Sequence, residues 1–203
     1  MNQKYKDILL HYLPSGTIEQ IIALLMSHPI NVKITRNRNS KLGDYRPPGR
    51  ERKHTITING GLGPHLFYLV FLHEYAHLLV WNKYGSSVSP HGKQWKEEFS
   101  SLLKSSIYQQ YMPQPLHQPI LSFALRIKAT FASDAHLWKT IKELDGNTHE
   151  ITVEQLPEDS LFIAANGKTF KKEQKLKTRY RCYCINNSRR YLFHPQAVII
   201  PVG

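Results

Sequence analysis

The chain has 203 residues and a formal net charge of +12, with 27 Lys and Arg against 15 Asp and Glu. Its hydrophobic fraction of 41% is ordinary for a globular protein, and no run of about 18 apolar residues lacks a charge or a His, which argues against a transmembrane helix and a membrane partner. The excess of positive charge predicts a polyanionic partner, most simply nucleic acid.

The amino-terminal residues contain no apolar segment of the signal-peptide kind. The chain has two cysteines, Cys182 and Cys184, which are separated by one residue and cannot form a disulfide framework. We therefore expect a cytoplasmic protein.

Two helices are expected at the start of the chain. Gln3–Leu13 has apolar residues at helical spacing, and a Pro-Ser-Gly sequence ends it. Thr17 is expected to cap a second helix, T-I-E-Q-I-I-A-L-L-M. The apolar residues of both helices are most simply core residues.

Three short strands are expected next. Ile30–Thr35 alternates apolar and polar residues, Lys41–Arg46 is a second candidate, and His54–Ile58 is rich in β-branched residues. They predict a small, mainly antiparallel sheet. If His54–Ile58 lies at a sheet edge, an extended peptide can bind beside it through main-chain hydrogen bonds.

Basic residues are concentrated between these strands. They can hold a phosphate backbone without sequence preference, or they can be a solvated hairpin surface. The candidates for nucleic-acid binding in this region are Arg36, Arg38, Lys41, Arg46, Arg50 and Arg52.

The stretch from His65 to Trp81 is apolar on nearly all sides, which predicts a buried helix. It contains the sequence H-E-Y-A-H. His73 and His77 are four residues apart, so they share one helix face and can bind one metal ion. Glu74 is placed to take a proton from a metal-bound water. Ordinary hydrogen bonding of these three side chains is the alternative.

A catalytic zinc site takes three protein ligands and leaves one position open. Two downstream residues can supply the third ligand. His91 opens the sequence H-G-K-Q-W, and Glu97 lies further along the helix expected at Gly92–Ser105. The residue types alone leave both possibilities open.

H-E-Y-A-H followed by H-G-K-Q-W resembles the SprT/Spartan family of zinc metalloproteases, which has HExxH and a later H-G-x-x-[W/F]. The segments R-N-R-N-S-K-L-G-D-Y-R and H-T-I-T-I-N look like the short strands that precede the family's metal helix, so the resemblance covers about half of the chain. It implies a zincin-like α+β core. It also implies one zinc ion with Glu74 as the general base and the ligands His73, His77 and His91.

The second half of the chain is expected to differ in structure. Residues 1–110 would form the metallopeptidase domain, residues 111–148 a helical linker region, and residues 149–203 a small β module that is barrel-like, because short strands follow one another from Glu150 onward. Many relatives in the SprT/Spartan family end in a four-Cys zinc ribbon, which Cys182 and Cys184 cannot build alone.

A second basic run lies in this module, interleaved with the aromatic residues Phe170, Tyr180 and Tyr183. This pattern is typical of single-stranded nucleic-acid binding, although the aromatics can instead be core residues. The candidates for nucleic-acid contact here are Lys171, Lys172, Lys175 and Arg179.

The sequence therefore predicts a zinc-dependent endopeptidase with a protein substrate. The resemblance implies proteins on DNA and DNA–protein crosslinks as substrates. The alternative is a non-catalytic nucleic-acid-binding protein, with a regulatory or adaptor role, that retains the metal site.

Overall fold

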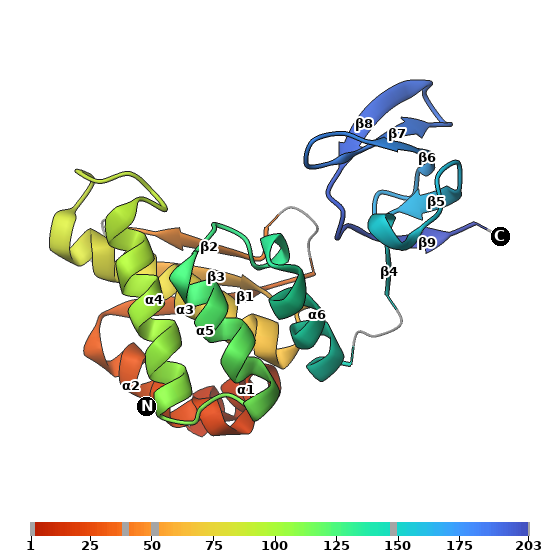
Figure 1. Cartoon of the computed structure of the whole chain (residues 1–203). Helices are drawn as coiled ribbons and strands as arrows, with labels where there is room; N and C mark the ends of the chain where they lie inside the picture. Colours follow the sequence, from red (N-terminus) through yellow and green to blue (C-terminus); the bar gives the residue numbers. More distant parts are fainter. Residues whose placement is uncertain (1–2, 38–40, 50–52, 147–149, 203) are drawn as a thin grey trace. The chain divides into compact units, whose positions relative to one another are not determined.

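The computed structural model describes residues 3–37, 41–49, 53–146 and 150–202. The described residues form six α-helices and two β-sheets (Figure 1), so the α+β prediction is confirmed. The chain divides into two compact units, Met1–Gly146 and Asn147–Gly203, and each has its own apolar core. None of the described helices combines the length and the hydropathy that a membrane span requires.

The first unit contains a three-stranded sheet formed by β1 (Ile30–Thr35), β2 (Gly43–Arg46) and β3 (His54–Asn59). The strand order is β1-β3-β2, with β3 parallel to β1 and antiparallel to β2. The sheet is therefore mixed rather than mainly antiparallel, because one of its two strand pairs is parallel. The central strand is β3, so His54–Ile58 is not at an edge, and β2 is one of the two edge strands.

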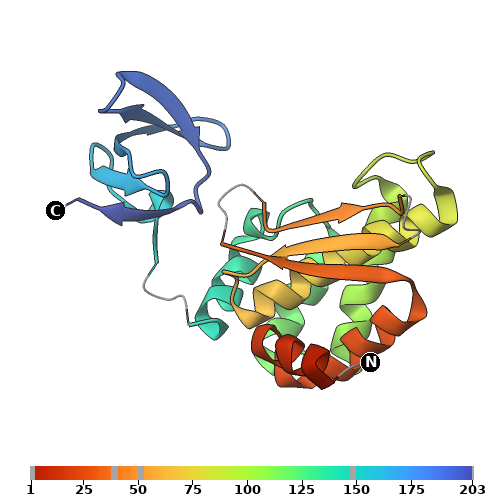
Figure 2. The ribbon, with the colours of Figure 1, turned by 180° about the vertical axis from the view of Figure 1, so that it is seen from behind.

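The helix α3 (Pro64–Tyr84) is the centre of the first unit. Its side chains are buried on nearly all sides, including Leu69, Phe71 and Leu78. Figure 2 shows the sheet covering one side of this helix. The two amino-terminal helices, α1 (Gln3–Tyr12) and α2 (Ile18–Ser27), add side chains to the same core, as predicted.

Three further helices complete this unit: α4 (Lys93–Tyr108), α5 (His117–Leu125) and α6 (Ala135–Leu144). Within residues 111–146, Leu116, Phe123 and Leu137 are buried in the core that contains α3. These residues thus belong to the first unit instead of forming a separate linker region. The Gln- and Pro-rich composition around residue 114 suggests a linker, but the apolar side chains within this segment are buried in the core.

The carboxylate of Asp145, just after α6, caps the first turn of α3. Its Oδ1 accepts hydrogen bonds from the backbone N–H of His65 (2.9 Å), and its Oδ2 from that of Leu66 (3.1 Å). The ring Nδ1 of His65 lies 2.8 Å from the same Oδ1. A helix begins with N–H groups that lack partners inside the helix, so a carboxylate there satisfies them and complements the helix dipole.

The second unit is a six-stranded antiparallel sheet with the order β4-β9-β5-β6-β7-β8. Among the described residues its edge strands, β4 and β8, do not pair, so the sheet is open where a barrel-like module was expected. The edge strand β4 has two residues, too few to close a barrel. The strands are β4 (Ile151–Thr152), β5 (Leu161–Ala164), β6 (Thr169–Lys175), β7 (Tyr180–Cys184), β8 (Arg189–Phe193) and β9 (Val198–Pro201).

Alternate residues of β7 form the core of this second unit. Tyr180, Cys182 and Cys184 are buried, and both cysteines are free thiols. Burial raises the pKa of Cys182 to about 11, which keeps this thiol protonated and unreactive at neutral pH. The two cysteines are therefore core residues.

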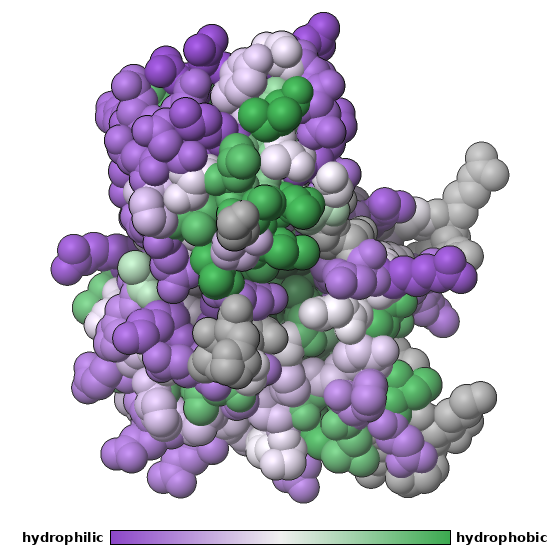
Figure 3. Space-filling view, turned by 90° about the vertical axis from the view of Figure 1, so that its right-hand side faces the viewer, coloured by the Kyte–Doolittle hydropathy of each residue, from purple (hydrophilic) through white to green (hydrophobic). Residues whose placement is uncertain are grey.

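Apolar side chains also gather on an exposed face of the second unit (Figure 3). Leu161 of β5 and Ile200 of the adjacent strand β9 are both exposed, as is Val202, whose N–H bonds the carbonyl of Leu161. The described residues of this unit include no α-helix that could cover the face.

Candidate metal centre

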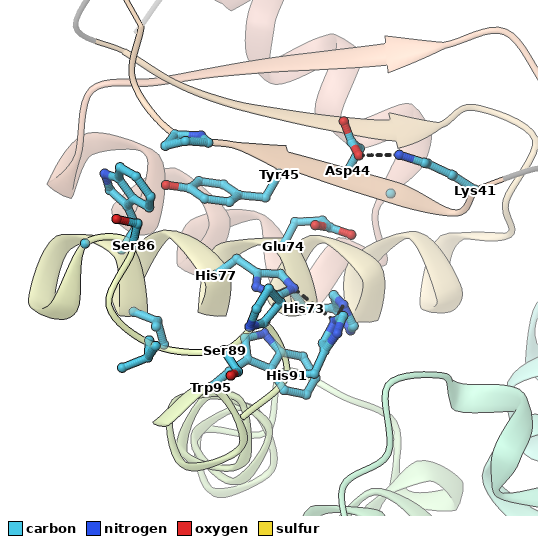
Figure 4. A pocket seen from close by; sticks show the side chains of 17 residues that line it. Lys41, Asp44, Tyr45, His73, Glu74, His77, Ser86, Ser89, His91 and Trp95 are labelled. Atoms are coloured by element: carbon cyan, nitrogen blue, oxygen red, sulfur yellow. Dashed lines mark hydrogen bonds and ion pairs between the residues drawn. The ribbon is translucent and has the colours of Figure 1, made fainter. Parts of the chain in front are cut away.

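The helix α3 presents His73 and His77 on one face, one turn apart, as the sequence predicts (Figure 4). The loop before α4 brings His91 to the same point. The Nε2 atom of His91 lies 3.1 Å from Nε2 of His73 and 3.1 Å from Nε2 of His77. The three side chains form the one group of potential metal ligands found among the described residues.

The backbone of His91 has a φ of 56°, in the left-handed region that is unfavourable for residues other than glycine. The next residue, Gly92, closes a turn by donating its N–H to the carbonyl of Ser89 (3.0 Å). Backbone strain of this kind costs about 1–3 kcal/mol and persists where the surrounding structure enforces it. Here the strained turn directs the imidazole toward α3.

The spacing of the three nitrogen atoms suits a metal ion. Tetrahedral zinc with Zn–N bonds of about 2.0–2.1 Å places its ligand atoms about 3.3 Å apart, close to the 3.1 Å observed. Hydrogen bonding explains the arrangement less well. A neutral imidazole whose Nε2 carries a proton can donate that proton to one neighbour, so the Nε2 atom of His91 cannot donate fully to both others.

The three imidazoles are held in the neutral form. Burial, and then the nearby His77 and His91, lower the pKa of His73 to about 3. Burial and His91 lower the pKa of His77 to about 4, and burial lowers the pKa of His91. Because metal ligation requires neutral imidazole, a cation near neutral pH meets little competition from protons at this site.

Two aromatic rings fix the orientation of His77. Trp95 stacks on it, with ring centroids 5.3 Å apart and planes 27° apart. Tyr45 of β2 stacks on it as well, at 6.1 Å and 12°, and Figure 4 shows the two rings on opposite sides of the imidazole. The hydroxyl of Tyr45 lies 2.8 Å from Nδ1 of His54.

Trp95 also supports the other two histidines, because its ring centroid lies 4.7 Å from that of His73 and 4.5 Å from that of His91. Its indole N–H points at the carbonyl of His73, at 3.4 Å. The resemblance implies an aromatic residue at this position. In the structure that residue, Trp95, packs against the rings of all three candidate ligands.

Glu74 lies between α3 and the edge strand β2, and its residue surface is 7% exposed. Gly43 of β2 is directly opposite. A Cβ atom added at Gly43 would lie 2.5 Å from Oε1 of Glu74 and 2.7 Å from Cγ1 of Val70. A glycine inside a strand often marks a close approach of another group, and here it makes room for the carboxylate.

An open cavity of about 530 Å³ joins these groups. Its wall includes His73, Glu74, His77 and His91 on one side and the strand β2 on the other. Beyond His77 the wall becomes apolar, with side chains contributed by Tyr45, Val80, Trp81 and Val88. The site is therefore accessible to an extended ligand.

Glu97, the alternative third ligand, does not join the histidines. Its side chain is 63% exposed, pairs with Lys93 at 4.0 Å, and faces a different groove. The neighbouring residue Glu98 forms an ion pair with Lys83.

The basic residues predicted between the strands have varied environments. A single carboxylate, Asp44, pairs with Lys41 at 2.7 Å and with Arg46 at 3.0 Å, and the hydrogen bond from Lys41 is the main cause that lowers the pKa of Asp44. Arg36 is exposed. Three predicted residues lie outside the described part of the chain, namely Arg38, Arg50 and Arg52.

In the second unit, Lys172, a candidate for nucleic-acid contact, lies in the core rather than on the surface. This residue is 3% exposed, and its ammonium group donates hydrogen bonds to the carbonyls of Leu156 and Glu154. It also lies 4.1 Å from the ring centroid of Tyr180, so it is a structural cation. Its position on the core face of β6, opposite Cys182, explains the burial.

The other basic residues of this run are largely compensated. Lys171 pairs with Asp159 at 2.8 Å and Lys175 pairs with Glu154 at 2.9 Å, whereas Arg179 is exposed. Two of the three interleaved aromatics, Phe170 and Tyr180, are buried in the core. These two rings are not available for stacking on bases.

No family model matches the sequence, and no match was found among curated proteins or solved structures.

Proposed function

We propose that this chain is a zinc metallopeptidase of the SprT type. The observation that carries the proposal is the convergence of three neutral imidazoles beside a buried carboxylate, Glu74, in an open cavity. The same proposal includes a zincin-like organisation of the first unit, in which an HExxH helix lies beside a sheet whose edge strand borders the site.

Zinc is proposed because of the donor set. Three imidazole nitrogens suit a borderline divalent ion, and three protein ligands leave one coordination position for chemistry. The residues that would hold the ion are His73, His77 and His91. When bound, zinc supplies Lewis acidity, which makes water a better nucleophile and polarises a peptide carbonyl.

Glu74 would move the proton. Its carboxylate accepts a proton from the attacking water as the water oxygen bonds to the carbonyl carbon. It then donates that proton to the amide nitrogen as the C–N bond breaks, which yields an acid and an amine. The contact with Gly43 and the burial of the side chain hold the carboxylate between the edge strand and the histidines.

The edge strand β2 supports an extended peptide as the substrate. Its residues Gly43, Asp44 and Tyr45 line the cavity, and one side of the strand has no partner strand in the described sheet. A peptide that adds to this edge is held mainly by its backbone, so many sequences are accepted. The apolar end of the cavity would receive one apolar side chain.

The net charge of +12 supports substrates that are bound to nucleic acid, such as DNA-associated proteins or DNA–protein crosslinks. Proximity to a polyanion would concentrate both enzyme and substrate on the same strand. The peptidase chemistry itself does not depend on this part of the proposal.

The test is a comparison of the variants Glu74→Gln and His91→Ala with the parent, using zinc content and cleavage of casein or histone, with and without single-stranded DNA. Glu74→Gln should keep one zinc and lose about 10²–10⁴-fold in rate, and His91→Ala should lose zinc. Glu143→Gln, a matched change on an exposed carboxylate of α6, should alter neither. Zinc binding without any Glu74-dependent cleavage would contradict the proposal and leave a non-catalytic metal protein.

A further inference from the structure

The solvent-facing side of α4 carries a row of lysines. Lys93, Lys96 and Lys104 lie at helical spacing on one face, whereas Trp95 and Phe99 on the other face are buried. The last lysine is eleven positions after the first, which corresponds to about 16 Å along the helix.

A second wall faces this row. It is formed by Leu125, Arg126 and Ile127, which lie at the end of α5 and just beyond it. The hydroxyl of Ser100 donates a hydrogen bond of 3.0 Å to the carbonyl of Ala124, which holds the two walls together. Between them lies an open groove of about 870 Å³.

The charge of the groove is largely uncompensated. Four cationic side chains line it, and its one carboxylate, Glu97, approaches Lys93 only to 4.0 Å with both groups exposed. Within the described ranges, no carboxylate forms an ion pair with Lys96, Lys104 or Arg126. The groove therefore differs from the two basic runs noted in the sequence, where carboxylates pair with many of the cations.

The groove lies next to the metal centre, since Gly92 and Lys93 line it and His91 immediately precedes them. The side chain of Leu125, which is 76% exposed, adds an apolar surface to the cationic row. A ligand that suits both features has a chain of negative charges and flat apolar groups beside it. A single nucleic-acid strand has this chemistry, whereas a duplex conceals its base faces.

We propose that this α4–α5 groove binds single-stranded nucleic acid through its phosphates. The strand would run along the lysine row, with a base against Leu125. It would bring bound proteins to the neighbouring cavity, a consequence that rests on the proposed peptidase function. The binding itself does not.

The test uses the full chain with Glu74→Gln, so that binding is read without cleavage. The probe is a fluorescein-labelled 16-nucleotide DNA of mixed sequence, and the measurement is anisotropy from 50 to 300 mM NaCl. Each phosphate contact in a single strand contributes about 0.7 to the slope of log Kd against log salt. Lys96→Ala combined with Lys104→Ala should therefore reduce the slope by about 1.4 and weaken binding at 50 mM NaCl.

The matched control removes two exposed lysines elsewhere in the same unit, with Lys33→Ala combined with Lys139→Ala. It loses the same charge and should keep the slope of the parent. An equal effect of both pairs, or no effect of the Lys96 and Lys104 pair, would overturn the groove assignment. A duplex that binds as tightly and responds equally to the substitutions would overturn the choice of a single strand.

Cleavage of a DNA-free peptide, measured on chains that retain Glu74, separates the two proposals. If the Lys96 and Lys104 variant cleaves that peptide normally but binds DNA like the parent, only the groove proposal fails. If no chain cleaves but the slope falls as expected, only the peptidase proposal fails.

Discussion

The ring of Tyr45 lies nearly parallel to the imidazole of His77, with centroids 6.1 Å apart and planes 12° apart. Tyr45 is in turn anchored by His54, at 2.8 Å from its hydroxyl. Burial raises the pKa of Tyr45 and is the main cause that lowers the pKa of His54, so both groups are neutral near pH 7. Tyr45 and His54 thus orient the candidate ligand His77, although neither of them belongs to the group of three histidines.

Removal of the Tyr45 ring should weaken metal binding. Groups that orient a ligating histidine typically change metal affinity by about 10–100-fold, so we expect a loss in this range for Tyr45→Ala and a smaller loss for Tyr45→Phe. Competition with a chromophoric zinc chelator measures the affinity without reference to activity. The exposed Tyr108 supplies the control, and an equal effect of Tyr108→Ala would contradict a positioning role.

Substitution of Gly43 should displace the Glu74 carboxylate. The Cβ of alanine would stand 2.5 Å from Oε1, so the carboxylate or the strand must move. We expect Gly43→Ala to keep its zinc and to lose at least about tenfold in kcat, since a positioned proton-transfer group contributes about 10²–10⁴. Gly49→Ala, where the added methyl meets no atom within 4 Å, should behave like the parent. Unchanged kcat in Gly43→Ala would contradict this geometry.

Loss of the Asp145 carboxylate should destabilise the first unit. Two backbone N–H groups at the start of α3 would lose their acceptor, which costs about 1–3 kcal/mol, and Asp145→Ala should lower the free energy of unfolding accordingly. All three tryptophans of the chain lie in this unit, so their fluorescence during urea unfolding reports its stability. Asp159→Ala, which removes an exposed carboxylate from the second unit, should leave that transition within about 0.5 kcal/mol of the parent.

The metal-free protein should become less stable as the pH falls below 6.5. The pKa of His73 in the folded state is about 3, below its ordinary value of 6.5, so the unfolded chain takes up its proton first. The stabilising contribution of neutral His73 is therefore complete above pH 6.5 and lost on acidification. Between pH 6.5 and pH 5 this residue alone accounts for about 2 kcal/mol.

Urea midpoints at pH 7, 6 and 5, measured without metal, test this expectation. His73→Ala should flatten the dependence on pH, whereas replacement of the exposed His136 should not. A parent midpoint that does not change over this range would show that His73 is not held neutral by its surroundings. Saturating zinc should raise the midpoint at pH 7, because a ligand that binds only the folded state stabilises it.

The parts of the site predicted from sequence are those with local causes. His73 and His77 share a helix face because of the helical repeat, and an apolar stretch around them indicates burial. His91 required a resemblance, since nothing local fixes its distance from α3. Tyr45 could not be placed, because its contact depends on β2 pairing with β3 and lying over α3.

Charge patterns were a weaker guide, because a sequence does not show which cations have partners. Asp44 lies among the basic residues that it compensates, and Asp159 is twelve residues from Lys171. Lysines of α4 are interspersed with Glu97 and Glu98, so they do not form a basic run in the sequence. Only in the folded helix do Lys93, Lys96 and Lys104 come together on one face, which lines the groove.

Because Asp145 caps α3, a shortened version of this protein must extend at least to this residue to keep the helix start intact. A fragment that stops at residue 110, where the sequence motifs end, would leave the start of the histidine-bearing helix without its acceptor and remove the α5 and α6 side chains from the interior. A fragment that ends at Gly146 retains both. We therefore expect the longer piece to take up zinc when expressed alone and the shorter one to aggregate.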